Sequence, residues 1–181
     1  MAESVEAFMN SIFQLQKADG GRMRIREFEA ALDKIKSQKS LRGFDFPHFN
    51  EQVRPFGILN VDCDGNYSTY SPELLGMDVA PYGSFSFGNI LKDEFAGAVE
   101  TPKFRDVFTD IQSGIKRCRE SCAYYGYCGG GAPANKYYEN GSLATAATIF
   151  CKYSVKLPLD IVLTDLEANL IPTEAASRTD S

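Results

Sequence analysis

The sequence predicts an α+β fold with amphipathic helices, a small β-hairpin and a cysteine-rich lobe around a metal centre. Three observations support this prediction. Apolar residues recur with helical spacing near both ends of the chain, Asp64-Gly65 lies between two β-rich runs, and four of the five cysteines lie within residues 118–151. A hydrophobic content of 44% over 181 residues is enough for a buried core and argues against intrinsic disorder.

Amphipathic helices are expected in residues 1–36. Their apolar faces consist of Val5, Phe8, Met9, Ile12 and Phe13 and, after a break at Gly20-Gly21, of Ile25, Phe28, Leu32 and Ile35. These faces have no evident core of their own and no obvious partner within the 181 residues. Exposed apolar faces often mark an interface, so we expect a docking surface made of Phe8, Ile12, Ile25, Phe28 and Leu32.

The central part of the chain is expected to begin with a β-hairpin. The β-rich runs 56–61 and 66–70 lie on either side of Asp64-Gly65. This pair favours a two-residue type I′ turn, because both central residues of that turn need a positive φ. The polar stretch before the hairpin, residues 37–55, contains Gly43 and Pro47 and is expected to be a linker.

Two more helices are expected around the cysteines. Thr101 and Pro102 are typical of the N-cap and first position of a helix, and this helix leads directly to Cys118. Apolar residues within 157–166 predict a last helix. We therefore divide the chain into a helical segment (1–36), a linker (37–55), a cysteine-containing domain (56–170) and a disordered tail (171–181).

The cysteines of the predicted metal centre are spaced as Cys118-x3-Cys122-x5-Cys128-x22-Cys151. Three thiolates that close can surround one centre, and a fourth from a later segment completes a tetrahedral sulfur set. Such a set suits zinc or an iron–sulfur cluster, and the spacing alone leaves both open, although it fits poorly with paired CxxC zinc knuckles. The glycines at 129–131 let the backbone approach the centre and direct N–H groups at sulfur.

The remaining features argue against further metal ligands, a nucleic-acid surface and a membrane span. Cys63 is expected to be a strand or turn residue rather than a ligand, and His48 has no partner histidine at metal-binding spacing. A net charge of -5 argues against a nucleic-acid surface, and no apolar run is long enough to predict a membrane span. The chain starts without the basic region of a signal peptide, and clustered free cysteines suit a reducing compartment, so we expect a cytoplasmic protein.

Residues 56 to about 167 resemble the SPASM-type C-terminal extension of radical SAM peptide maturases. The resemblance is greatest to the cyanobacterial-type maturases of Gly-rich-repeat peptides, which are thought to form cyclophane crosslinks. It rests on Asp64-Gly65, Tyr70-Ser-Pro-Glu-Leu-Leu-Gly76, Phe87-Gly-Asn-Ile90, Cys118 to Cys128, Cys128-Gly-Gly-Gly131, Asn140-Gly141 and Phe150-Cys151. Residues 5–35, including Arg24-Ile-Arg-Glu27, look like the end of the barrel in those enzymes.

The resemblance implies one auxiliary [4Fe–4S] cluster bound by Cys118, Cys122, Cys128 and Cys151, with zinc as the alternative. It does not imply a second cluster, because Tyr70-Ser71 and Ala132 stand where two-cluster members of the family have cysteines. The CxxxCxxC motif that supports S-adenosylmethionine binding does not occur in these 181 residues, so no site for this cofactor is expected.

The resemblance also implies a function and partners. It indicates an auxiliary cluster module of an enzyme that crosslinks a ribosomally made precursor peptide. A radical SAM core, in cis or in trans, and a Gly-rich precursor peptide would be its partners, and the chain is not expected to be active alone. The alternatives are a non-catalytic adaptor that binds a peptide or partner, and a zinc-stabilised structural domain.

Overall fold

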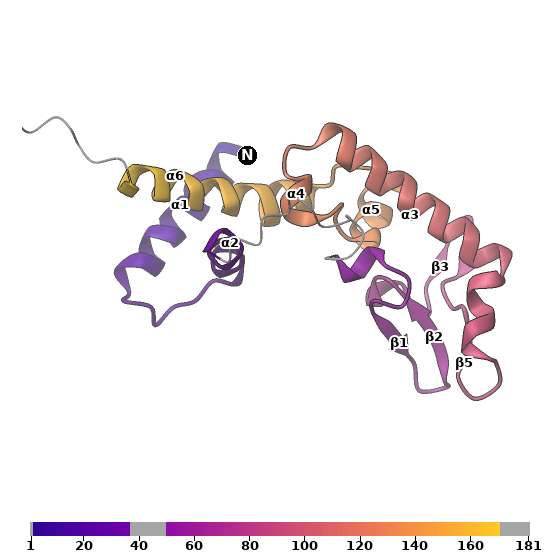
Figure 1. Ribbon diagram of the computed structural model, residues 1–181. Helices are drawn as coiled ribbons and strands as arrows, with labels where there is room; N and C mark the ends of the chain where they lie inside the picture. The colour runs from indigo at the N-terminus through magenta and orange to yellow at the C-terminus, as the bar shows by residue number, and fades with distance from the viewer. Residues whose placement is uncertain (1, 37–49, 171–181) are drawn as a thin grey trace, which may run out of the picture. The chain divides into compact units, whose positions relative to one another are not determined.

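A computed structural model describes residues 2–36 and 50–170, which divide into two compact units (Figure 1). The described part of the first unit is residues 2–36 and 152–170, and that of the second is residues 50–151. The structure confirms an α+β fold with a small antiparallel sheet. His48 and the expected tail at 171–181 lie outside the described residues.

The first unit contains three α-helices from opposite ends of the sequence. They are α1 (Ala2–Ala18), α2 (Arg26–Lys36) and α6 (Leu157–Leu170), and a π-helical turn (Cys151–Lys156) precedes α6. Helix α6 packs against both α1 and α2 (Figure 1). The buried apolar side chains of this unit are Phe13, Phe28, Ala31, Leu159, Ile161 and Val162.

The expectation that the first two helices lack a core of their own is wrong. Phe28 is 0% exposed, and its ring centroid lies 4.9 Å from that of Phe13. Helix α6 supplies the missing apolar surface from the other end of the chain. Phe8, in contrast, is 60% exposed. Of the residues of the predicted docking surface, Phe8 is therefore accessible and Phe28 is not.

A polar contact fixes the connection between α1 and α2. The side-chain carbonyl of Gln16 accepts a hydrogen bond from the Ile25 N–H at 3.0 Å, and its amide donates to the Glu29 carboxylate at 2.9 Å. Gln16 is 8% exposed. Since buried polar groups are costly unless they are hydrogen-bonded, both ends of this amide contribute to the pairing of the helices.

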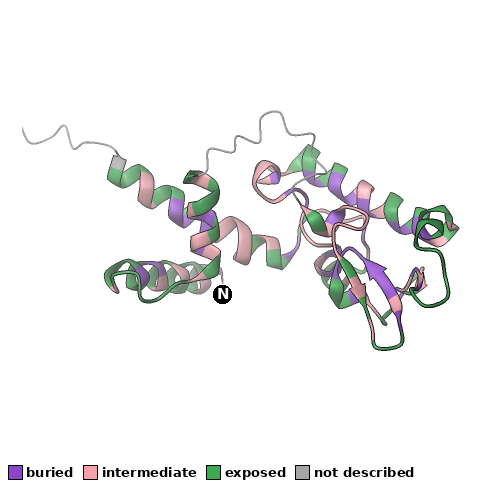
Figure 2. Cartoon of the chain, turned by 60° about the horizontal axis from the view of Figure 1, so that its bottom comes forward, coloured by how far each residue is buried: buried purple, intermediate pink, exposed green. Residues whose placement is uncertain are grey.

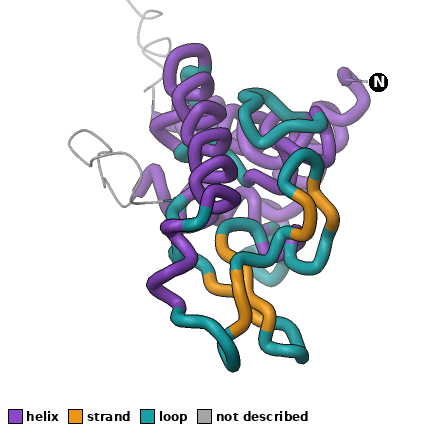
Figure 3. The backbone as a smooth tube through the Cα atoms, turned by 90° about the vertical axis from the view of Figure 1, so that its right-hand side faces the viewer, coloured by secondary structure: helices purple, strands orange, loops and turns teal. Residues whose placement is uncertain are grey.

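The second unit is built on a sheet of three strands in the order β1-β2-β5. Figure 3 shows the strands of the chain in orange among its helices and loops. The strands are β1 (Leu59–Val61), β2 (Asn66–Thr69) and β5 (Gly88–Asn89), and both pairings are antiparallel. A separate antiparallel pair consists of β3 (Asp78–Val79) and β4 (Gly83–Ser84). The central strand β2 is the most buried of these strands, whereas the loop that joins β1 and β2 is mostly exposed (Figure 2).

The predicted hairpin between β1 and β2 is confirmed, but its predicted turn type is wrong. Val61 pairs with Tyr67, and the Asp62 N–H donates to the Asn66 carbonyl at 2.9 Å, which leaves a three-residue loop. In this loop only Gly65 has a positive φ, of 83°. The Asp62 carboxylate accepts hydrogen bonds from the N–H groups of Asp64 and Asn66, both at 2.9 Å, and these contacts favour the longer loop.

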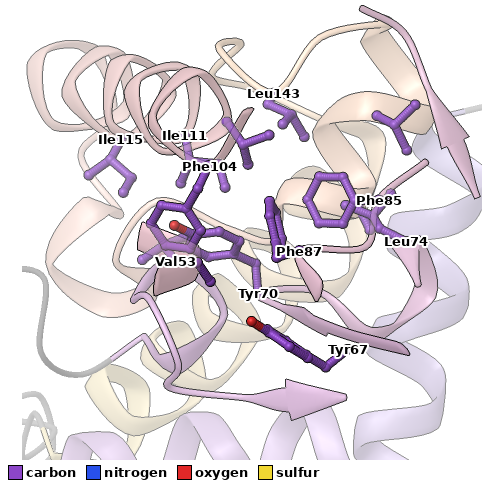
Figure 4. Packing of buried hydrophobic residues seen from close by; sticks show 14 of the residues in the cluster. Val53, Tyr67, Tyr70, Leu74, Phe85, Phe87, Phe104, Ile111, Ile115 and Leu143 are labelled. Carbon is purple, nitrogen blue, oxygen red and sulfur yellow. The ribbon is translucent and has the colours of Figure 1, made fainter. Parts of the chain in front are cut away.

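The core of the second unit is a cluster of aromatic and aliphatic side chains beneath helix α3 (Pro102–Ser121) (Figure 4). Phe104 of this helix contacts three other aromatic rings, with centroids 5.2 Å from Phe87, 5.8 Å from Phe56 and 6.1 Å from Tyr70. Burial of large aromatic surfaces is the main source of stability in a unit of this size. The packed face of α3 therefore fixes the position of the residues at its C-terminal end.

The two compact units divide the chain differently from the expected ranges. Val53, which lies in a 3-10 turn at Glu51–Val53, is 1% exposed in the core of the second unit. This burial is the reason that residues 50–55 belong with the domain rather than with a linker. Helix α6 belongs to the first unit because its apolar face packs on α1 and α2. The resemblance of residues 5–35 to the end of a barrel stays a prediction.

Candidate metal centre

Helix α3 delivers the first two cysteines. Its N-terminus is formed as predicted: the Thr101 side-chain oxygen accepts a hydrogen bond from the Phe104 N–H at 3.2 Å, and Pro102 occupies the first turn. Cys118 lies in the last turn of the helix. Cys122 is the C-cap residue, and its N–H donates to the Cys118 carbonyl at 2.9 Å.

A short helix and three glycines position the third cysteine. Cys128 is the last residue of α4 (Tyr125–Cys128), which Gly129 ends in a left-handed conformation. Gly129, Gly130 and Gly131 have φ values of 69°, 103° and 72°. A Cβ atom on Gly130 would lie 3.2 Å from the Ile115 side chain, and one on Gly131 would lie 3.9 Å from the Cys151 sulfur. Glycine is therefore favoured by conformation at all three positions, and at Gly130 also by the close approach of the Ile115 side chain.

The sulfur atoms of Cys118 and Cys151 contact backbone and side-chain oxygen atoms. The Cys118 sulfur lies 3.8 Å from the Gly130 carbonyl oxygen and 3.6 Å from that of Ala146. The Thr148 hydroxyl donates to the Cys151 sulfur at 3.0 Å and accepts a hydrogen bond from the Cys151 N–H, also at 3.0 Å. The backbone thus comes close to the sulfurs, as expected, but the glycine contact with Cys118 comes from a carbonyl rather than from an N–H group.

The pKa of Cys118 responds to burial and to the charges of other groups of the site. Burial raises the pKa of this thiol, the ammonium of Lys136 opposes the shift, and the charges of Cys128, Cys151 and Cys122 add to it. The backbone links three of these cysteines, because Gly130 contacts the Cys118 sulfur and Gly131 approaches the Cys151 sulfur in the turn that follows Cys128. Cys118 is buried and the other three are half-buried.

The fifth cysteine is placed differently. Cys63 is exposed and lies in the loop between β1 and β2, which is the turn alternative of the two positions expected for it. Within residues 2–36 and 50–170, no three His, Cys, Asp or Glu side chains are arranged to hold a metal ion together. In the described part of the chain the four thiols therefore do not form a finished ligand shell. Their donor set fits an iron–sulfur cluster or zinc, and the ligand assignment stays a prediction.

Lys136 is a component of the site that sequence reasoning missed. It lies in α5 (Pro133–Asn140) and is only 2% exposed. Burial lowers the pKa of its ammonium, whereas the charge of Cys118, a hydrogen bond with Cys118, and the charges of Cys151 and Cys128 raise it. A lysine in a short polar helix is normally a surface residue, so nothing in the sequence indicated this position.

Asn50 was also missed, because it lies at the edge of a stretch that looks like a linker. Its side-chain amide donates to the carbonyl of Cys128 at 3.2 Å and to that of Gly131 at 3.1 Å. Its side-chain oxygen accepts from the Gln52 N–H at 3.1 Å. Asn50 therefore connects the turn after Cys128 to the 3-10 segment that contributes Val53 to the core.

Comparison with known proteins gives one informative relative. The chain is 38% identical over 163 residues to a protein of Synechocystis sp. named uncharacterized protein sll1766. The alignment covers 90% of this chain but 39% of the relative, so the chain spans about two fifths of that protein's length. No family model and no solved structure matches the chain. Across the described residues, no helix has both the length and the apolar composition that a membrane span needs.

Proposed function

We propose that the chain is an auxiliary cluster module of a peptide-modifying radical SAM enzyme. In this proposal Cys118, Cys122, Cys128 and Cys151 hold one [4Fe–4S] cluster. The observation that carries the proposal is that the turn after Cys128 lies against the sulfurs of two other cysteines. The Gly130 carbonyl oxygen is 3.8 Å from the Cys118 sulfur, and a Cβ atom on Gly131 would lie 3.9 Å from the Cys151 sulfur. The resemblance to SPASM-type extensions supplies the class of enzyme.

The cluster, when bound, would supply an electron-transfer centre, and its bonds to the cysteines would connect the chain segments that carry them. The residues of the chain hold and shield it. Cys118 is fixed by the packed helix α3, and Cys151 is oriented by the Thr148 hydroxyl. Asn50 holds the turn between Cys128 and Gly131. Four cysteine ligands would leave no open iron position for direct ligation of a substrate.

The partners in this proposal are those that the resemblance implies: a radical SAM core and a Gly-rich precursor peptide. The length of the Synechocystis relative is compatible with a module that works within a larger protein. The alternative functions differ from it in one observable each. An adaptor would bind a peptide or partner through the sheet and the loops around the cluster, with no radical SAM core as its partner, and a structural zinc domain would contain zinc and no acid-labile sulfide.

The expected chemistry of the chain alone tests the proposal. With the cluster loaded, and with S-adenosylmethionine and dithionite present, the chain should form no 5′-deoxyadenosine above a no-protein control. The physical reason is that these residues contain no CxxxCxxC motif to hold a cluster with an open iron site. Product release is followed by liquid chromatography with mass detection. Reductive cleavage of S-adenosylmethionine by this chain would contradict its role as an auxiliary module.

A further inference from the structure

Lys136 is a lysine whose side chain is buried in the second unit. Lysine is almost never fully buried unless its ammonium is paired with an anion or held by hydrogen bonds. Lys136 is 2% exposed, and none of the ion pairs within residues 2–36 and 50–170 includes it. The leading interactions that favour its charged form all involve cysteine thiols.

The ammonium of Lys136 occupies a space that the backbone leaves open for it. Its Nζ atom lies 2.9 Å from the position that a Cβ atom on Gly114 would take. The carbonyl oxygens of Leu143 and Thr145 lie 2.6 and 2.9 Å from the same position. The bare backbone of Gly114, one turn before Cys118 in α3, thus permits the lysine and two carbonyls to meet there.

We propose that Lys136 is the fixed cation that balances the negative charge of the four-cysteine centre and raises its reduction potential. This inference rests on the proposed function. Four thiolates outweigh the charge of an iron–sulfur core, and reduction adds a further negative charge. A buried cation beside Cys118 stabilises the reduced form more than the oxidised form, since net charge and hydrogen bonds to sulfur both set cluster potentials.

The experiment compares the midpoint potential of the loaded chain in four proteins. The wild type is measured with K136M, which removes the charge, with K136R, which retains it, and with K116M as the matched control. Lys116 is also in α3, two residues from Cys118, but its side chain is 75% exposed. Water therefore screens its charge. Anaerobic redox titrations followed by electron paramagnetic resonance give the potentials.

We expect a lower potential for K136M than for the wild type, and potentials close to wild type for K136R and K116M. An unchanged potential in K136M would overturn the proposal, and so would an equal decrease in K116M. If K136M stays folded but no longer binds the cluster, binding by K136R supports a requirement for charge. Loss of binding in both folded variants shows a requirement for the shape of lysine instead, and contradicts the proposal.

A variant that fails to fold is resolved by a second neutral substitution, K136Q, whose fold is checked by circular dichroism before loading. If K136M and K136Q both unfold without iron while K136R folds, the charge stabilises the fold of the protein rather than balancing the charge of the four-cysteine centre. This outcome also contradicts the proposal. The proposed function fails by a different observation. A wild-type chain that takes up no iron and sulfide contradicts it before any variant of Lys136 is compared.

Discussion

Replacing Cys118 with alanine is expected to abolish cluster binding, whereas replacing Cys63 with alanine leaves iron and sulfide content unchanged. Cys118 is the buried member of the four thiols and interacts with each of the others. Cys63 is exposed in a hairpin loop and makes a matched control, because the same chemical change is made outside the site. Alanine at Cys122, Cys128 or Cys151 is expected to act as at Cys118.

The measurement is iron and acid-labile sulfide per chain after anaerobic reconstitution, together with the visible absorption of the cluster. Loss of the cluster should also loosen the segments that it joins, since metal binding in a small lobe contributes directly to its folding. Hydrogen exchange of α4 and α5 should then become faster in C118A than in C63A. Full iron content in C118A, or equal losses in both variants, would contradict the ligand assignment.

Replacing Phe28 with alanine is expected to lower the free energy of unfolding of the first unit by about 3–5 kcal/mol. Phe28 is 0% exposed and its ring meets that of Phe13, so truncation leaves a cavity in a small core. Phe8→Ala is the control, because Phe8 lies on α1 but is 60% exposed, and surface substitutions usually change stability by only about 0.5 kcal/mol.

Residue-resolved hydrogen exchange of the whole chain measures this effect. The slowest amides of α1, α2 and α6 report the unfolding of the first unit, and those of α3 report the second unit. We expect the protection of the first unit to fall strongly in F28A and little in F8A. Similar losses in the two variants would contradict the core described for these helices and would favour a docking surface that includes both side chains.

Local signals in the sequence predicted the elements around the site well. Thr101 and Pro102 identified the start of α3, where the Thr101 side chain caps the helix. Asp64-Gly65 identified the hairpin but not its turn, because the Asp62 carboxylate favours a three-residue loop through bonds to backbone N–H groups. A side chain that precedes the turn thus decided between two loop lengths that the central pair alone allows.

Features that depend on long-range packing could not be predicted in this way. An apolar stripe on a helix shows that a face is buried but not what covers it, so the pairing of α6 with α1 and α2 had no local signal. The burial of Lys136 has the same origin. Its ammonium is hidden because Gly114, on another helix, leaves space for it. Asn50 contacts a turn 78 residues away from it in sequence, which no local pattern indicates.

The most direct test of the central claim is the metal and sulfide content of the wild-type chain after anaerobic purification. The claim is that Cys118, Cys122, Cys128 and Cys151 together hold one [4Fe–4S] cluster. It predicts iron and acid-labile sulfide in equal amounts, at the level of one cluster per chain, with zinc below stoichiometry. Stoichiometric zinc without acid-labile sulfide would contradict the claim, and so would a folded chain that binds neither metal after reconstitution.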